Sequence, residues 1–137
     1  MLSTVAVFEE NKFTPAQTVK DLITFDKITP PPKCWSKVSH GTVNATQALM
    51  HSCNYFFYEM GYLLSMDSNN VINNKKGLTT LKKYAELFGL TETSGVELSE
   101  TSPNVSDTDA VRSAIGQGTN RYAPIQLSRY VTTIANN

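Results

Sequence analysis

The stretch HSCNYFFYEMG, residues 51–61, constrains the fold of this 137-residue chain more than any other. Apolar residues recur around it three or four positions apart, which predicts an amphipathic helix with one buried face. The members of this stripe are Ala45, Ala48, Leu49, Cys53, Phe56, Phe57, Met60, Leu63 and Leu64. Ser52 lies on the same stripe, and Asn54 follows two residues later. A hydroxyl and an amide in the middle of a buried face require an explanation.

The spacing of Ser52 and Asn54 sets a geometric condition on any shared role. Residues two apart in a helix point to nearly opposite sides, whereas in an extended segment they point the same way. If both serve one site, the backbone at Cys53 must leave the helix and Cys53 must face the core. This interpretation predicts one helix ending near His51 and another beginning near Tyr55. The alternative is an unbroken helix in which Ser52 bonds the carbonyl four residues back and Asn54 faces solvent.

Local signals predict further helices along the chain. Residues 2–10 have the spacing of a short buried helix. Asn44 and Gln47 form a capping-box pattern at the start of the central helix. The clearest helix covers residues 78–90, where Gly89 suits the left-handed position after the last turn.

The remaining segments are loops, short extended pieces and a last helix. Residues 14–36 are rich in proline and predict irregular structure with one or two extended pieces, and residues 94–100 predict a short strand. Residues 68–77 form a polar connection, and Pro124 suits the first turn of a helix. The apolar stripe expected on that helix consists of Leu127, Tyr130, Val131 and Ile134. The chain therefore predicts one mainly helical domain, residues 1–137, with long loops and little sheet.

Charge and cysteine usage exclude several function classes. Twelve basic residues balance twelve acidic ones, and the basic residues form no extended stripe, so we expect no nucleic-acid partner. Cys34 and Cys53 lie in no CxxC spacing, and we expect buried free thiols rather than a disulfide. With two histidines and no evident cluster joining them to the cysteines, we expect neither a metal site nor a cofactor. Residues 1–10 match neither a signal peptide nor a membrane span.

Three markers occur in order along the chain. The first is SHGTVNATQALMHSCNYFFYEMG, which contains Ser-x-Asn, and the second is AELFGLTETSGVELSE. The third is AIGQGTNRYAPIQLSRYVTTIANN. Ser-x-Asn alone arises often by chance, but the three together closely resemble the class B penicillin-binding proteins, the peptidoglycan D,D-transpeptidases. Even MLSTVAVFEENKFTP resembles the helix that follows their nucleophile. The resemblance implies the helical subdomain of a penicillin-binding/serine β-lactamase-like transpeptidase fold.

The resemblance also implies acyl transfer. In this family a Ser-x-x-Lys serine attacks the D-Ala-D-Ala carbonyl of a peptidoglycan stem peptide or a β-lactam, and a Lys-Thr-Gly strand lies across the cleft. Ser52 would relay a proton to the leaving nitrogen, and Asn54 would position substrate and lysine. Tyr55 is expected at the cleft. The parent protein would be anchored in the cytoplasmic membrane, with this domain on the outer side.

The GQG sequence at residues 116–118 has two interpretations. It is too isolated for a phosphate-binding loop. Gly116 and Gly118 suit a tight turn with positive φ, closed by the Gln117 amide. The resemblance adds a role in supporting the substrate side of the cleft.

The departures from the family pattern matter as much as the matches. The chain contains no Ser-x-x-Lys and no Lys-Thr-Gly, and Ser3 has no lysine three residues later. Ala123 stands where the family commonly has threonine, which removes a capping oxygen. We therefore expect one wall of an active site, inactive alone, whose uncovered apolar face invites dimerisation. The rival hypotheses are a β-lactam sensor domain and a non-catalytic helical interaction module.

Overall fold

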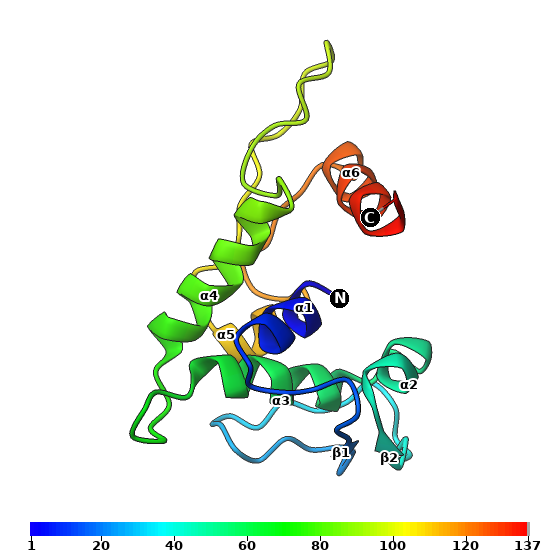
Figure 1. Ribbon diagram of the computed structural model, residues 1–137, viewed down its shortest axis with the longest axis vertical. Coiled ribbons are helices and arrows are strands. Elements are labelled where there is room, and N and C mark those ends of the chain that lie inside the picture. Colours follow the sequence, from blue (N-terminus) through cyan, green and yellow to red (C-terminus); the bar gives the residue numbers. More distant parts are fainter. Residues whose placement is uncertain (137) are drawn as a thin grey trace.

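The computed structural model describes residues 1–136 and is mainly helical, as the sequence predicts (Figure 1). In chain order the elements are α1 (Leu2–Glu9), β1 (Val19–Lys20), β2 (Thr42–Val43), α2 (Ala45–Met50), α3 (Asn54–Ser65), α4 (Asn74–Leu87), α5 (Ala110–Ser113) and α6 (Pro124–Asn136). Helix α3 is central, and α1, α4 and α5 pack against it.

The apolar stripe around residues 51–61 forms the core. Phe56, Met60 and Leu64 lie four residues apart on one face of α3, and each is at most 2% exposed. The ring of Phe56 meets that of Phe13 edge to face, with 5.7 Å between centroids. Full burial of side chains of this size stabilises the fold by about 1.5–3 kcal/mol each, so this stripe is a main source of stability.

Close packing of α3 on α5 depends on a glycine. A Cβ atom at Gly61 would lie 2.7 Å from the carbonyl oxygen of Ala110 and 2.8 Å from the Cα of Val111. Both are backbone atoms, which cannot rotate away. The two helices therefore approach to a distance that only glycine permits at this position.

Helix α4 ends as predicted but begins earlier. Gly89 has φ +66°, and the N–H of Leu90 donates to the carbonyl of Ala85 at 2.8 Å, which is the hydrogen bond of a Schellman motif. At the other end Asn73 is the N-cap, since its side chain accepts the N–H of Lys76 at 3.1 Å. The polar connection expected over residues 68–77 therefore contains the cap and first turn of the helix.

Extended structure is confined to short pieces. β1 and β2 pair antiparallel, with Val19 opposite Val43, and an isolated bridge joins Thr24 to Lys33, which confirms the extended pieces predicted within residues 14–36. The strand predicted over residues 94–100 is wrong: that segment forms bends and pairs with no strand in the described part of the chain. A strand forms only where another strand can pair with it, and the local apolar pattern does not show whether such a strand is nearby.

Helix α6 lies apart from the other helices (Figure 1). Its apolar stripe is only partly buried. Tyr130 is 9% exposed and its ring meets Phe88 edge to face at 5.1 Å. Leu127, Val131 and Ile134 are 43%, 51% and 36% exposed. The predicted stripe exists, but within residues 1–136 only Tyr130 of its four members is buried.

Candidate active site

The helix break predicted between Ser52 and Asn54 is present. Ser52 has φ +51°, in the left-handed region, and its N–H donates to the carbonyl of Leu49 at 3.2 Å. The N–H of Cys53 donates to the carbonyl of Ala48 at 2.9 Å. These two bonds form a Schellman motif, in which Ser52 occupies the position that glycine usually holds. A non-glycine residue in this conformation is strained, which is common at functional sites.

The break places Ser52 and Asn54 on one surface. Cys53 is extended, with φ −72° and ψ 98°, and its side chain is fully buried, so it faces the core as predicted. Ser52 and Asn54 both line an open cleft of about 370 Å³. Gly116, from the GQG turn, and Leu127, from α6, line the same cleft. Residues from the first and third sequence markers therefore meet in one place.

The glycine turn has the predicted backbone but a different closing bond. Gly116 and Gly118 have φ +86° and +87°. The bond across the turn runs from the side-chain amide of Asn120 to the carbonyl of Gln117, at 2.9 Å, and does not come from the Gln117 side chain. Gln117 is exposed, and of these three residues only Gly116 lines the cleft. The turn thus contributes backbone to this surface.

The placement of Tyr55 at the cleft is wrong. Its side chain is 4% exposed and packs edge to face on Phe25, with 5.2 Å between ring centroids. Tyr55 is the second residue of α3, so it lies about 100° around the helix from Asn54. Phe57, three residues after Asn54, shares its face and lines the cleft instead.

Ser3 is not available as a nucleophile. It is 2% exposed, and its hydroxyl donates to the carbonyl of Ala114 at 3.0 Å. This bond links α1 to the segment that precedes the glycine turn, which gives Ser3 a packing role.

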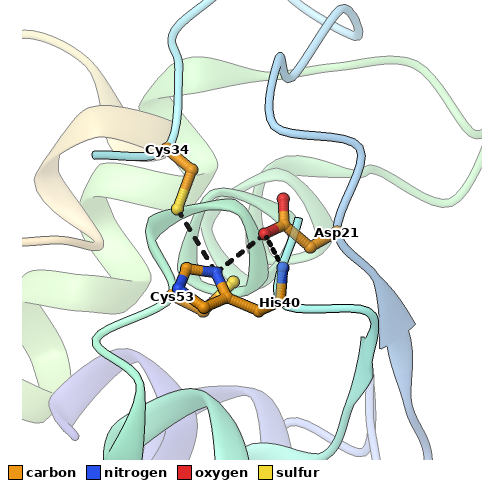
Figure 2. A group of neighbouring side chains, drawn as sticks. All are labelled: Asp21, Cys34, His40 and Cys53. Atoms are coloured by element: carbon orange, nitrogen blue, oxygen red, sulfur yellow. Dashed lines mark hydrogen bonds and ion pairs between the residues drawn. The ribbon is translucent and has the colours of Figure 1, made fainter. Parts of the chain in front are cut away.

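On the core side of the Ser-x-Asn turn, where Cys53 points, four side chains from separate segments form a cluster (Figure 2). They are Asp21, directly after β1; Cys34, in the loop between the strands; His40, shortly before β2; and Cys53. One potential ligand atom from each lies within 4.8 Å of all the others. The expectation that no cluster joins the histidines to the cysteines is therefore wrong, because the residues lie far apart in sequence and meet only in the fold.

The cluster is tightly bonded and protected from solvent. Asp21 is 1% exposed, and it accepts the backbone N–H of Ile23 at 2.7 Å and of His40 at 2.9 Å. The ring Nδ1 of His40 lies 2.8 Å from Asp21 Oδ2 and 3.8 Å from Cys34 Sγ. Burial alone would raise the pKa of Asp21, but the hydrogen bonds from His40 and Ile23 hold it below its ordinary value. Burial raises the pKa of the Cys53 thiol to about 12.

Comparison with known proteins identifies the family. Residues 1–137 match the penicillin binding protein transpeptidase domain. The chain belongs to this family. It is similar to the peptidoglycan D,D-transpeptidase MrdA of Haemophilus influenzae, with 25% identity covering 97% of this chain and 21% of that protein. It is also similar to MrdA of Acinetobacter baumannii, with 24% identity over 75% of this chain and 16% of that protein.

Solved penicillin-binding proteins have the same fold over this region. Penicillin-binding protein 2 from Helicobacter pylori gives a TM-score of 0.83 at 24% identity, covering 98% of this chain and 26% of that one. A chain of a peptidoglycan synthase complex gives 0.83 at 23% identity, covering 99% and 24%. This transpeptidase segment thus spans about a quarter of these relatives or less. In residues 1–136 no helix has both the length and the apolar character needed to cross a bilayer.

The cluster in this transpeptidase segment has the chemistry of a metal site. Cysteine thiolate, imidazole and carboxylate are all ligands of zinc, whereas calcium and magnesium favour oxygen ligands alone. Four protein ligands fill a tetrahedral site and leave no open position for a reacting water. The donor set therefore fits a structural zinc ion. Such an ion would link β1, the inter-strand loop, the start of β2 and the Ser-x-Asn turn.

Proposed function

We propose that this chain forms one wall of a peptidoglycan D,D-transpeptidase active site, in which Ser52 relays protons and Asn54 positions substrate. The carrying observation is the backbone break at Cys53, which brings both residues to the lining of one cleft. The nucleophile and its lysine would come from a Ser-x-x-Lys segment elsewhere in a longer protein. Residues 1–137 alone would then neither hydrolyse nor transfer a peptide.

The proposed chemistry follows from the two side chains. The catalytic serine attacks the carbonyl of a D-Ala-D-Ala stem peptide, and the C–N bond breaks as the leaving nitrogen takes up a proton. The hydroxyl of Ser52 can donate that proton and accept another from the lysine, since a hydroxyl is both donor and acceptor. The amide of Asn54 offers two donors and one acceptor, which suit the substrate peptide and the lysine.

The family supports the wider setting of this proposal. A longer protein of this kind would cross-link peptidoglycan outside the cytoplasmic membrane, to which it would be anchored, and β-lactams would acylate its serine. The family match and the MrdA relatives favour a transpeptidase over a β-lactam sensor domain. The cleft shared by Ser52 and Asn54 favours an active-site wall over a purely helical interaction module.

Acylation of the full-length protein by a penicillin tests the role of Ser52. Ser52→Ala should slow acylation strongly, because general acid–base groups contribute about 10²–10⁴-fold. Ser128→Ala, at an exposed position on α6, is the matched control and should acylate at the wild-type rate. Equal rates for Ser52→Ala and wild type would leave Ser52 as a packing residue only.

We also propose that Asp21, Cys34, His40 and Cys53 bind a structural zinc ion, because their ligand atoms lie within 4.8 Å of one another. Binding would release protons from the thiols and tie the Ser-x-Asn turn to the strands. An ion present at 100 times its dissociation constant would raise the free energy of unfolding by about 2.7 kcal/mol.

Cobalt titration of the 137-residue chain tests this second proposal. Thiolate ligation should produce an intense cobalt charge-transfer absorption, and one equivalent of zinc should abolish it. Cys34→Ser should weaken binding, while Ser36→Ala, in the same loop but outside the cluster, should not. Absence of the absorption in the wild-type chain, with no zinc already bound, would refute the site.

A further inference from the structure

The turn at Ser52 has a third anchor besides its two Schellman bonds. The indole N–H of Trp35 donates to the carbonyl of Ser52 at 2.9 Å and approaches the carbonyl of His51 at 3.4 Å. These carbonyls lie beyond the last turn of α2, where no helical N–H can reach them. A side chain from the loop between the strands therefore caps the end of α2.

Burial does not explain the position of Trp35. The side chain is 66% exposed, an unusual state for the largest apolar residue type, and it lines none of the core. Its ring instead lies against His40, with 5.9 Å between centroids, and His40 stacks on His51 at 5.6 Å and 22°. Trp35 is thus held by ring contacts and by the hydrogen bond to Ser52.

The Trp35 bond and the Schellman bonds control different parts of the turn. The Schellman bonds use the N–H groups of Ser52 and Cys53 and fix how the chain leaves α2. The Trp35 bond uses the carbonyl of Ser52, which belongs to the peptide plane that joins Ser52 to Cys53. Rotation of that plane would turn Ser52 relative to Asn54, the first residue of α3.

We propose that Trp35 is a positioning residue for Ser52 and Asn54, acting through the carbonyl of Ser52. It holds a left-handed serine, φ +51°, in a conformation that this residue type seldom adopts. Its effect on acylation rests on the proposed function of Ser52. Its effect on the geometry of the turn is independent of that function.

The single tryptophan of the chain makes the geometry directly measurable. In the 137-residue chain labelled with ¹⁵N and ¹³C, the one indole N–H should exchange with water more slowly than that of free tryptophan, although the ring is exposed. Trp35→Phe keeps a ring and removes the N–H, and it should shift the backbone signals of Ser52, Cys53 and Asn54. Val38→Ala, at a 75% exposed position in the same loop, should leave them unchanged. Free-like exchange of the wild-type indole, or unmoved Ser52 signals in Trp35→Phe, would overturn the proposal.

Penicillin acylation of the full-length protein separates positioning from simple stability. Trp35→Phe should slow the first-order acylation step roughly threefold to tenfold, the size of one neutral hydrogen bond, with non-covalent binding unchanged. An unchanged acylation step beside a slow Ser52→Ala would refute positioning by Trp35 while the function of Ser52 stands. An unchanged rate in Ser52→Ala would instead refute the proposed function.

Discussion

Replacement of Ser52 by glycine should stabilise the protein while removing a proposed active-site group. Ser52 has φ +51° at the C′ position of a Schellman motif. A side chain with a Cβ costs about 1–2 kcal/mol in the left-handed region. Glycine removes this cost, but its greater conformational freedom stabilises the unfolded chain by about 0.4–1 kcal/mol. The net expectation is a free energy of unfolding higher by about 0.5–1 kcal/mol, which raises the melting temperature by roughly 2–4 °C for a chain of this size.

Thermal and urea unfolding of the 137-residue chain provide the assay. Ser52→Ala keeps the Cβ and should stay within about 0.5 kcal/mol of wild type, because within residues 1–136 the Ser52 hydroxyl makes no hydrogen bond. Ser128→Gly, in the exposed part of α6, is the matched control and should lose about 0.5 kcal/mol. If Ser52→Gly loses stability as Ser128→Gly does, the strain assigned to Ser52 does not exist. A gain would indicate a serine retained at the expense of stability, as expected at functional sites.

Four further predictions address packing, capping, charge and association. Ala123→Thr should raise stability by about 0.5–2 kcal/mol in urea unfolding, because the N–H of Ala123 already bonds Gln126 Oε1 at 2.8 Å and the variant completes a capping box. A lower free energy of unfolding for Ala123→Thr would show that residue 123 is not the N-cap of α6. Gly61→Ala should cost about 1–3 kcal/mol in the same assay, since its Cβ would meet backbone at 2.7 Å, and a neutral result would mean that α5 moves freely. Hydrogen bonds from Lys83 and Tyr84 hold the pKa of Glu10 below its ordinary value of 4.5. The ionised Glu10 therefore contributes fully to the free energy of unfolding above pH 4.5, and this contribution is lost as the pH falls through the pKa of the folded state. Glu10→Gln should therefore lose less stability than wild type on acidification, and parallel acid curves would contradict this. Sedimentation should show concentration-dependent dimers of the 137-residue chain through the exposed apolar face of α6, and a monomer at all concentrations would refute this association.

The parts of the fold that the sequence predicts correctly depend on near neighbours. Asn44 accepts the N–H of Gln47 at 2.9 Å and Gln47 Oε1 accepts the N–H of Asn44 at 3.0 Å, so both halves of the capping box lie within three residues. Gly89 likewise ends α4 through bonds to its own last turn. The strand predicted over residues 94–100 fails for the opposite reason. Its existence would need a partner strand from a distant segment, and local apolar residues cannot show whether that partner exists.

The candidate site shows the same division. Periodicity alone favours an unbroken helix through Ser52, and the break is predicted only if Ser52 and Asn54 share a site. The prediction for Tyr55 fails because it follows Asn54 by one residue in α3. That step of about 100° turns its side chain from the cleft to the core. The sequence does not predict the metal-type cluster, because Asp21 and Cys53 come from segments with no shared local pattern. The short spacing of Cys34 and His40 was the one available signal.

The cluster and the cleft are joined through the middle residue of Ser-x-Asn. An extended residue sends its side chain to the opposite side from both neighbours, so a tripeptide that aims Ser52 and Asn54 into the cleft must aim Cys53 into the core. Here the inward side chain is a thiol that meets Asp21 and His40. A change in the backbone dihedral angles of Cys53 would therefore move Ser52 and Asn54 together. Cys53 occupies the position that Ser-x-Asn leaves unspecified. Its packing in the core nevertheless constrains it as much as Ser52 and Asn54, because it fixes where both of them lie at the cleft.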